Sequence, residues 1–223
     1  MKKYAIIVAG GSGSRMNTDL PKQFLELAGR PLLMHTIDAF YNFDPTILII
    51  LVLPQEHIPT WERLILDHEF DTPHQVAIGG STRFNSVENG LNLIGDDGIV
   101  AIHDGARPMI SSAVIQRTFD QASDSGNGVA AVKVKDSIRQ VLGKKSSAVD
   151  RNNFYIVQTP QTFKVDLIKR AFTATTTNQF TDDASVAEAN GEEIVLVEGS
   201  YENIKITTPE DLAMAATVWA ERK

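Results

Sequence analysis

The feature that most constrains the fold of this chain is a regular alternation of short apolar segments with segments of helical period. The apolar segments are rich in Ile and Val and lack strict alternation with polar residues, which is typical of strands buried on both faces. Strands are predicted at residues 4–8, 47–53, 75–78, 99–102, 128–134 and 194–197. Helices are predicted at about 31–41, 59–67, 82–94, 111–123, 164–173, 182–190 and 208–220. This order predicts an α/β fold with a Rossmann-like, mainly parallel sheet and helices on both faces.

Side chains suited to capping mark the starts of four of these helices. They are Ser81, Ser111 with Ser112, Thr181, and Thr208, the last of which precedes Pro209. Right-handed crossovers would bring the carboxyl ends of the strands to one edge of the sheet, and folds of this kind bind ligands at that edge.

Residues 135–158 interrupt the alternation. Their centre is polar and contains Gly and Lys, and extended segments flank it on both sides. The segment predicts a projecting β-hairpin arm on a single domain that spans residues 1–223. Because the arm carries Val, Ile, Phe and Tyr, we expect a homodimer to cover it.

The charge balance narrows the possible partners. The 223 residues include 21 basic and 28 acidic side chains, a net charge of -7, with no long run of either sign. A chain of this kind is a poor match for nucleic acid. No stretch approaches the ~18 apolar residues of a membrane span, and the apolar start is shorter than an export signal, so we expect a cytoplasmic protein without membrane contact. A phosphorylated ligand would then depend on a few local cations.

A glycine-rich turn with two cations follows the first predicted strand. In AGGSGSRM (residues 9–16), Gly10, Gly11 and Gly13 let successive backbone N–H groups face an anion. The spacing matches neither the Walker pattern nor G-x-G-x-x-G. Three glycines alone favour an ordinary turn, but Arg15 and Lys22 on the same loop favour a triphosphate site.

Two further segments lie where a strand gives way to a loop or helix. In HDGARP (103–108), Asp104 could face a ribose or its magnesium, or it could form an Asx turn and pair with Arg107. In GGSTRFNSV (79–87), Gly80 permits close backbone approach, and Ser81 and Ser86 could read a base edge. Alone, this second segment is better explained as a helix start.

Three other features have weaker signals. Lys205 stands between two isoleucines in an extended segment, so its side chain should point away from the core, where it could face a cleft. Taken alone, Lys205 and Arg151 are better explained as solvated surface cations. We expect His103 to serve packing or a local hydrogen bond. TDDAS (181–185) is predicted to cap a helix and nothing more.

Together, these segments resemble the 2-C-methyl-D-erythritol 4-phosphate cytidylyltransferases of the non-mevalonate isoprenoid pathway. The resemblance runs through AGGSGSRM, LPKQF, GGSTRFNSV, HDGARP, VKDSI, VDRN, QTPQTF and TDDAS to EGSYENIKITTPEDL. The glycine loop recurs across sugar nucleotidyltransferases, whereas the ordered set is specific.

The resemblance implies roles for individual residues. Arg15 and Lys22 would bind the triphosphate of CTP and stabilise charge in the transition state. The methylerythritol phosphate would be positioned by Arg107, Ser137, Arg151, Thr159 and Lys205, with Arg151 reaching the site of a partner subunit. Nucleotide contacts would come from Ala9, Gly10, Gly11, Gly13, Gly80, Ser81, Ser86 and Asp104. A magnesium ion would lie beside Asp104.

Three alternatives remain open. A ribitol-5-phosphate cytidylyltransferase shares the fold and most of these motifs. An NAD-dependent oxidoreductase would need an acidic residue at the end of the second strand, where this chain has Leu53 and Pro54. A non-catalytic nucleotide sensor would bind CTP without turnover.

Overall fold

The structure is a computed structural model that describes residues 1–11 and 21–222. Its centre is a seven-stranded sheet in the order β11-β7-β10-β6-β1-β4-β5. The strands are β1 (Lys3–Val8), β4 (Leu48–Leu53), β5 (Gln75–Ile78), β6 (Ile99–Asp104), β7 (Asn127–Lys133), β10 (Tyr155–Lys164) and β11 (Leu196–Glu198). All neighbouring pairs are parallel except those of β10, which runs antiparallel to both β6 and β7. The predicted mainly parallel sheet is confirmed.

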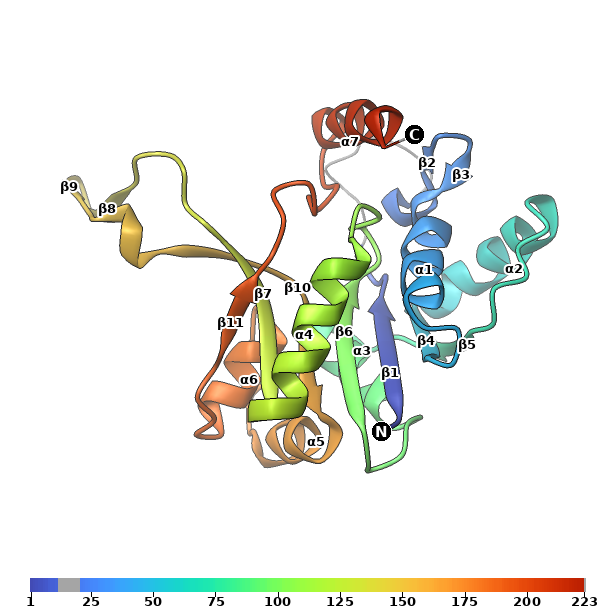
Figure 1. Ribbon diagram of the computed structural model, residues 1–223, viewed down its shortest axis with the longest axis horizontal. Coiled ribbons are helices and arrows are strands. Elements are labelled where there is room, and N and C mark those ends of the chain that lie inside the picture. Colours follow the sequence, from blue (N-terminus) through green and yellow to red (C-terminus); the bar gives the residue numbers. More distant parts are fainter. Residues whose placement is uncertain (12–20, 223) are drawn as a thin grey trace.

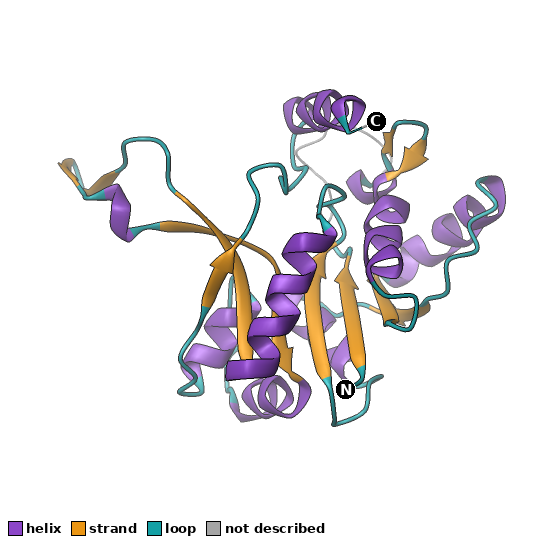
Figure 2. Ribbon diagram, viewed as in Figure 1, coloured by secondary structure: helices purple, strands orange, loops and turns teal. Residues whose placement is uncertain are grey.

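Helices cover both faces of the sheet, as predicted (Figures 1 and 2). They are α1 (Leu32–Phe43), α2 (Ile58–Asp67), α3 (Arg83–Leu91), α4 (Ser112–Ser125), α5 (Val165–Ala174), α6 (Asp183–Ala189) and α7 (Pro209–Glu221). Successive residues of β1 point to opposite faces, so Ile6 packs in the core under α3, α5 and α6, whereas Ile7 packs under α1, α2 and α4. Both side chains are fully buried.

A third, smaller apolar cluster lies above the strand ends. Residues Leu27, Met109, Ile206 and Ala215 join α7 to the short strands β2 (Glu26–Leu27) and β3 (Arg30–Pro31). Helix α7 begins as predicted, since the Thr208 side chain accepts from the backbone of Asp211 and completes a capping box. Two other predicted caps are wrong by one residue: Thr82, not Ser81, caps α3, and Asp182, not Thr181, caps α6.

The projecting arm contains the hairpin of β8 (Arg139–Leu142) and β9 (Lys145–Ala148) and the short helix η4 (Arg151–Asn153). Figure 1 shows it extending away from the sheet. Its predicted end at residue 158 is too late, because Tyr155, Ile156 and Val157 already pair with β7 as the start of β10. None of the helices within residues 1–11 and 21–222 has the length and apolar character that a membrane crossing requires.

Candidate active site

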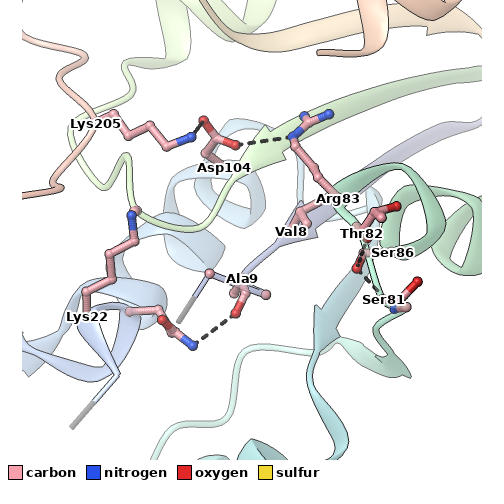
Figure 3. A pocket seen from close by; sticks show the side chains of 14 residues that line it. Val8, Ala9, Lys22, Ser81, Thr82, Arg83, Ser86, Asp104 and Lys205 are labelled. Atoms are coloured by element: carbon pink, nitrogen blue, oxygen red, sulfur yellow. Dashed lines mark hydrogen bonds and ion pairs between the residues drawn. The ribbon is translucent and has the colours of Figure 1, made fainter. Parts of the chain in front are cut away.

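A pocket of about 250 Å³ opens where β1, β5 and β6 end (Figure 3). The loops after these parallel strands form most of its wall, because the fold brings their carboxyl ends to one edge. Its lining consists of Val8, Ala9, Gly10, Gly11, Lys22, Gln23, Gly80, Ser81, Thr82, Arg83, Ser86, Asp104, Ala106 and Lys205. The pocket therefore collects all the described residues that the family resemblance assigned to the nucleotide.

The loop after β5 is held in one conformation by its own hydrogen bonds. The Gly80 N–H donates to Ser86 Oγ at 3.1 Å, and that hydroxyl donates to the Thr82 carbonyl at 2.9 Å. A Cβ on Gly80 would lie 2.3 Å from Asn85 Cβ, so only glycine fits. Ser86 is buried, and its hydroxyl is used to shape the loop. The loop thus presents a preformed backbone surface to the pocket.

Lys22 and Lys205 extend into the same pocket from distant parts of the chain (Figure 3). Lys22 begins the short helix η2 (Lys22–Phe24). The next residue, Gln23, is buried and donates from Nε2 to the Ala9 carbonyl at 2.9 Å, which ties η2 to the end of β1. Lys205 is fixed through its neighbour Ile206, whose N–H donates to the Ala106 carbonyl at 2.9 Å. Two cations therefore reach one pocket from anchored backbone.

Asp104 lies among three cations at the end of β6. Its Oδ2 is 2.9 Å from Lys205 Nζ and 3.3 Å from Arg107 Nε, and its Oδ1 is 3.8 Å from Arg83 Nε. Burial alone would raise the pKa of Asp104, but the attraction of Lys205, Arg83 and Arg107 outweighs it and holds that pKa far below its usual range. Asp104 is therefore ionised at neutral pH, and its pairing with Arg107 matches one of the two alternatives left open by the sequence.

A second pocket of about 190 Å³ adjoins the first. It is lined by Arg83, Asp104, Arg107, Val157, Gln158, Thr159, Gln161, Thr181, Asp182 and Lys205. Arg83, Asp104 and Lys205 line both pockets and form a shared wall. Two ligands placed in the two pockets would thus meet beside these three side chains.

Hydrogen bonds of Thr159 connect β10 to the backbone of Asp104 and to the His103 side chain. The Asp104 N–H donates to Thr159 Oγ1 at 3.0 Å, and Thr159 Oγ1 lies 3.1 Å from His103 Nδ1. His103 Nε2 lies 3.2 Å from the Arg107 carbonyl, which can only accept, so Nε2 carries the proton. The prediction that His103 serves packing and local hydrogen bonding is confirmed. Thr159 lines the second pocket, and its contact with substrate stays a prediction.

The two predicted substrate residues on the arm lie outside both pockets of the single chain. Ser137 is exposed, and Arg151 donates to the Lys135 carbonyl within the arm. Gly13 and Arg15 lie outside the described residues. The structure thus gathers Arg107, Thr159 and Lys205 at one site, whereas Ser137 and Arg151 lie apart from it.

The sequence did not predict one pair of charged residues at this site. Arg83 donates from Nη1 and Nη2 to the two oxygens of Asp183, at 2.8 Å and 2.6 Å. Asp183 is fully buried, so the prediction that TDDAS only caps a helix is wrong. The capping belongs to Asp182, which accepts from the Ser185 N–H at 3.0 Å. A separation of 100 residues leaves no local pattern that could reveal the pair.

The site suits a magnesium ion only in company with phosphates. Within the described part of the chain, no three His, Asp or Glu side chains form a metal-binding group. Asp104 is a single ionised carboxylate at the pocket wall, and Mg²⁺ is commonly held by one or two carboxylates together with substrate phosphates and water. Asp104 therefore fits as a protein ligand of such an ion.

The comparisons with known proteins agree with one another. A family model described as 2-C-methyl-D-erythritol 4-phosphate cytidylyltransferase matches residues 4–221. A protein of that name from Bacteroides fragilis is 49% identical over 98% of this chain and 100% of its own length. The crystal structure of the enzyme of that name from Thermus thermophilus is 30% identical, with a TM-score of 0.82 over 98% of each chain. One from Francisella tularensis is 34% identical, with a TM-score of 0.80 over 96% of this chain and 98% of that one. The chain belongs to the 2-C-methyl-D-erythritol 4-phosphate cytidylyltransferase family.

Proposed function

We propose that this protein joins CTP to 2-C-methyl-D-erythritol 4-phosphate, giving CDP-methylerythritol and pyrophosphate in non-mevalonate isoprenoid biosynthesis. One observation carries the proposal beyond family membership: two adjoining pockets share a wall that contains Asp104 and Lys205. The pocket at the glycine turns suits the nucleotide, and the smaller polar pocket suits the sugar phosphate. The reacting phosphates would then meet at the shared wall.

The proposed reaction needs alignment and positive charge more than a base. A phosphate monoester has a second pKa of about 6, so its attacking oxygen is already ionised at neutral pH. That oxygen forms a bond to the α-phosphorus of CTP, the α–β bridging P–O bond breaks, and pyrophosphate leaves with the electron pair. Lys22, with Arg15, would neutralise the triphosphate, while Lys205 would orient the nucleophile.

Asp104 would hold the magnesium ion, which supplies additional positive charge to the phosphates. Asp104 also keeps Lys205 at the shared wall until the substrate phosphates arrive, since the two groups are 2.9 Å apart. The Asp104 carboxylate would therefore have two tasks. It would orient cations in the free enzyme, and it would bind the magnesium ion once the substrates are present.

We further propose a homodimer in which the arm of one chain reaches the site of the other. At the root of the arm, Phe154, Tyr155, Ile156 and Val157 are 40% to 54% exposed, an apolar run that a second copy could cover. Such a dimer would bring Arg151 to the sugar-phosphate pocket of the partner subunit. The cytoplasmic location expected from the sequence stays a prediction.

A pyrophosphate-release assay tests the proposed activity directly. Each nucleoside triphosphate is paired with methylerythritol phosphate and with ribitol 5-phosphate in the presence of Mg²⁺. We expect the highest kcat/KM for CTP with methylerythritol phosphate. A higher value with ribitol 5-phosphate would reassign the substrate, and tight CTP binding without turnover on either would indicate a sensor.

A further inference from the structure

One partly buried ion pair at the site has no part in the chemistry described so far. Arg83 begins α3 and Asp183 begins α6, and the guanidinium meets the carboxylate through two short, parallel hydrogen bonds. Asp183 is fully buried. Although burial opposes the charge on Arg83, Asp183 and then Asp104 hold the pKa of Arg83 above its usual value. Burial raises the pKa of Asp183, and the attraction and hydrogen bonds of Arg83 oppose that rise. The two short bonds between the guanidinium and the two carboxylate oxygens have the geometry of an ion pair.

The pair is fixed by its surroundings. Gln161 on β10 accepts at Oε1 from the backbone N–H groups of Asp183 and Ala184, at 2.9 Å and 2.8 Å. Gln161 also donates from Nε2 to Asp182 Oδ2 at 2.9 Å. The start of α6 is thus attached to the sheet, and the Asp183 carboxylate offers Arg83 a stationary partner.

Arg83 also faces the place where the substrates would meet. It lines both pockets, and its Nε, which is not used for Asp183, lies 3.8 Å from Asp104 Oδ1. Lys205, on the same wall, has a 41% exposed side chain on a flexible stem, so it can turn toward an incoming phosphate. Arg83 cannot turn without losing its two bonds to Asp183.

Stability alone is a weak reason to keep such a pair. Desolvation of two buried charges offsets most of their attraction, and well-packed apolar residues often serve equally well. Stabilisation of a transition state, in contrast, requires donors that are already in place when charge develops.

We infer that Arg83 is a further phosphate-contacting residue of this site and that Asp183 is the positioning residue that holds it. The inference rests on the proposed function. Phosphates that enter the two pockets compete with Asp104 for its cations, and Arg83 then presents Nε–H to them at a fixed position.

The test separates stability from turnover by removing the whole pair. Asp183→Leu alone leaves a partly buried guanidinium without its partner, so Tm should fall clearly. The double variant Arg83→Met/Asp183→Leu removes both charges, and Tm should recover most of that loss. Its kcat for pyrophosphate release should nevertheless fall about 100-fold, the scale expected for loss of one preorganised donor, with KM for CTP changed by less than about threefold.

A matched control is the Arg170–Asp166 pair on α5, which is exposed and lies outside both pockets. Arg170→Met/Asp166→Leu should leave kcat unchanged. If the double variant at residues 83 and 183 does not fold, the kcat of Arg83→Lys tests the inference instead. Lysine keeps the positive charge but cannot form the two parallel hydrogen bonds. A folded Arg83→Lys enzyme should also lose kcat.

The outcomes are distinguishable. A folded double variant, or a folded Arg83→Lys variant, with wild-type kcat would overturn the inference and leave the proposed function intact. A wild-type enzyme that releases no pyrophosphate from CTP with either sugar phosphate would overturn both.

Discussion

Lys22 is one of the cations that line the nucleotide pocket. It enters the pocket from η2, and the bond from Gln23 to Ala9 fixes the backbone beneath it. We expect Lys22→Ala to lower kcat/KM by a factor of about 10²–10³, or roughly 3–4 kcal/mol of transition-state stabilisation. Circular dichroism should show an unchanged fold. Lys2→Ala, at an exposed lysine paired with Asp97, is the control and should be fully active in the same pyrophosphate assay.

The free energy of unfolding should depend on pH through His103, the buried histidine beside Asp104. Burial lowers the pKa of His103 to about 4, whereas an unfolded histidine titrates near 6.5. Between these values the unfolded chain binds a proton that the folded chain does not, so the free energy of unfolding should fall as pH drops from about 6.5 to 4. The loss is at most about 3 kcal/mol.

Urea unfolding at several pH values checks this, with His103→Gln as the non-titrating comparison. Burial also lowers the pKa of His35, but that contribution is the same in both proteins and cancels in their difference. Curves that run parallel between pH 4 and 6.5 would contradict the role assigned to His103.

At the scale of an element, helix α7 depends on its first turn. Thr208 accepts from the Asp211 N–H at 3.3 Å, and Asp211 accepts in return from the Thr208 N–H at 2.9 Å. Thr208→Ala should lower the free energy of unfolding by about 1 kcal/mol. Thr217→Ala, on the exposed side of the same helix, should change it little, and equal losses in urea unfolding would argue against the capping box.

Strand β10 shows what local sequence patterns cannot predict. The other six strands of the main sheet were predicted because each is an apolar run, whereas β10 contains Gln158, Thr159, Pro160 and Gln161. Its polar residues are buried because they bind Asp104, Asn203 and the start of α6, contacts that exist only after folding. Its burial therefore depends on long-range partners, and short-range periodicity cannot reveal it.

The same limit applies to the site. Residues at or just beyond the end of a strand, such as Asp104 and Gly80, were candidates for the pocket because parallel strands end at one edge. The place of Lys205 between two isoleucines could only predict that its side chain leaves the core, and its assignment to the site came from the family resemblance. The Arg83–Asp183 pair could not, since its members stand on different helices 100 residues apart.

At the scale of the whole molecule, the proposed dimer predicts sites built from two chains. Lys22→Ala damages the pocket of its own chain, while Arg151→Ala would damage the pocket of the partner subunit. Equal mixing of the two inactive variants, with subunit exchange, should restore about a quarter of wild-type activity, because half the dimers are mixed and each has one intact site. Pyrophosphate release after mixing measures this.

The control pairs Lys22→Ala with Lys205→Ala, which affect the same pocket of one chain. In that mixture every site has a defect, so activity should not return. Restoration in the control, or none with Arg151→Ala, would contradict a site shared through the arm.

The arm root and the pocket wall are consecutive stretches of one strand, since β10 passes from exposed Tyr155–Val157 to buried Gln158–Gln161. The pairing of β10 with β7 changes register between Val157 and Gln161, so inserting or deleting one residue at the root would disturb the register that places Thr159 and Gln161. The β8–β9 tip carries no such restriction. Insertions and deletions in descendants of this protein should therefore be found at the β8–β9 tip and be absent from the root of the arm.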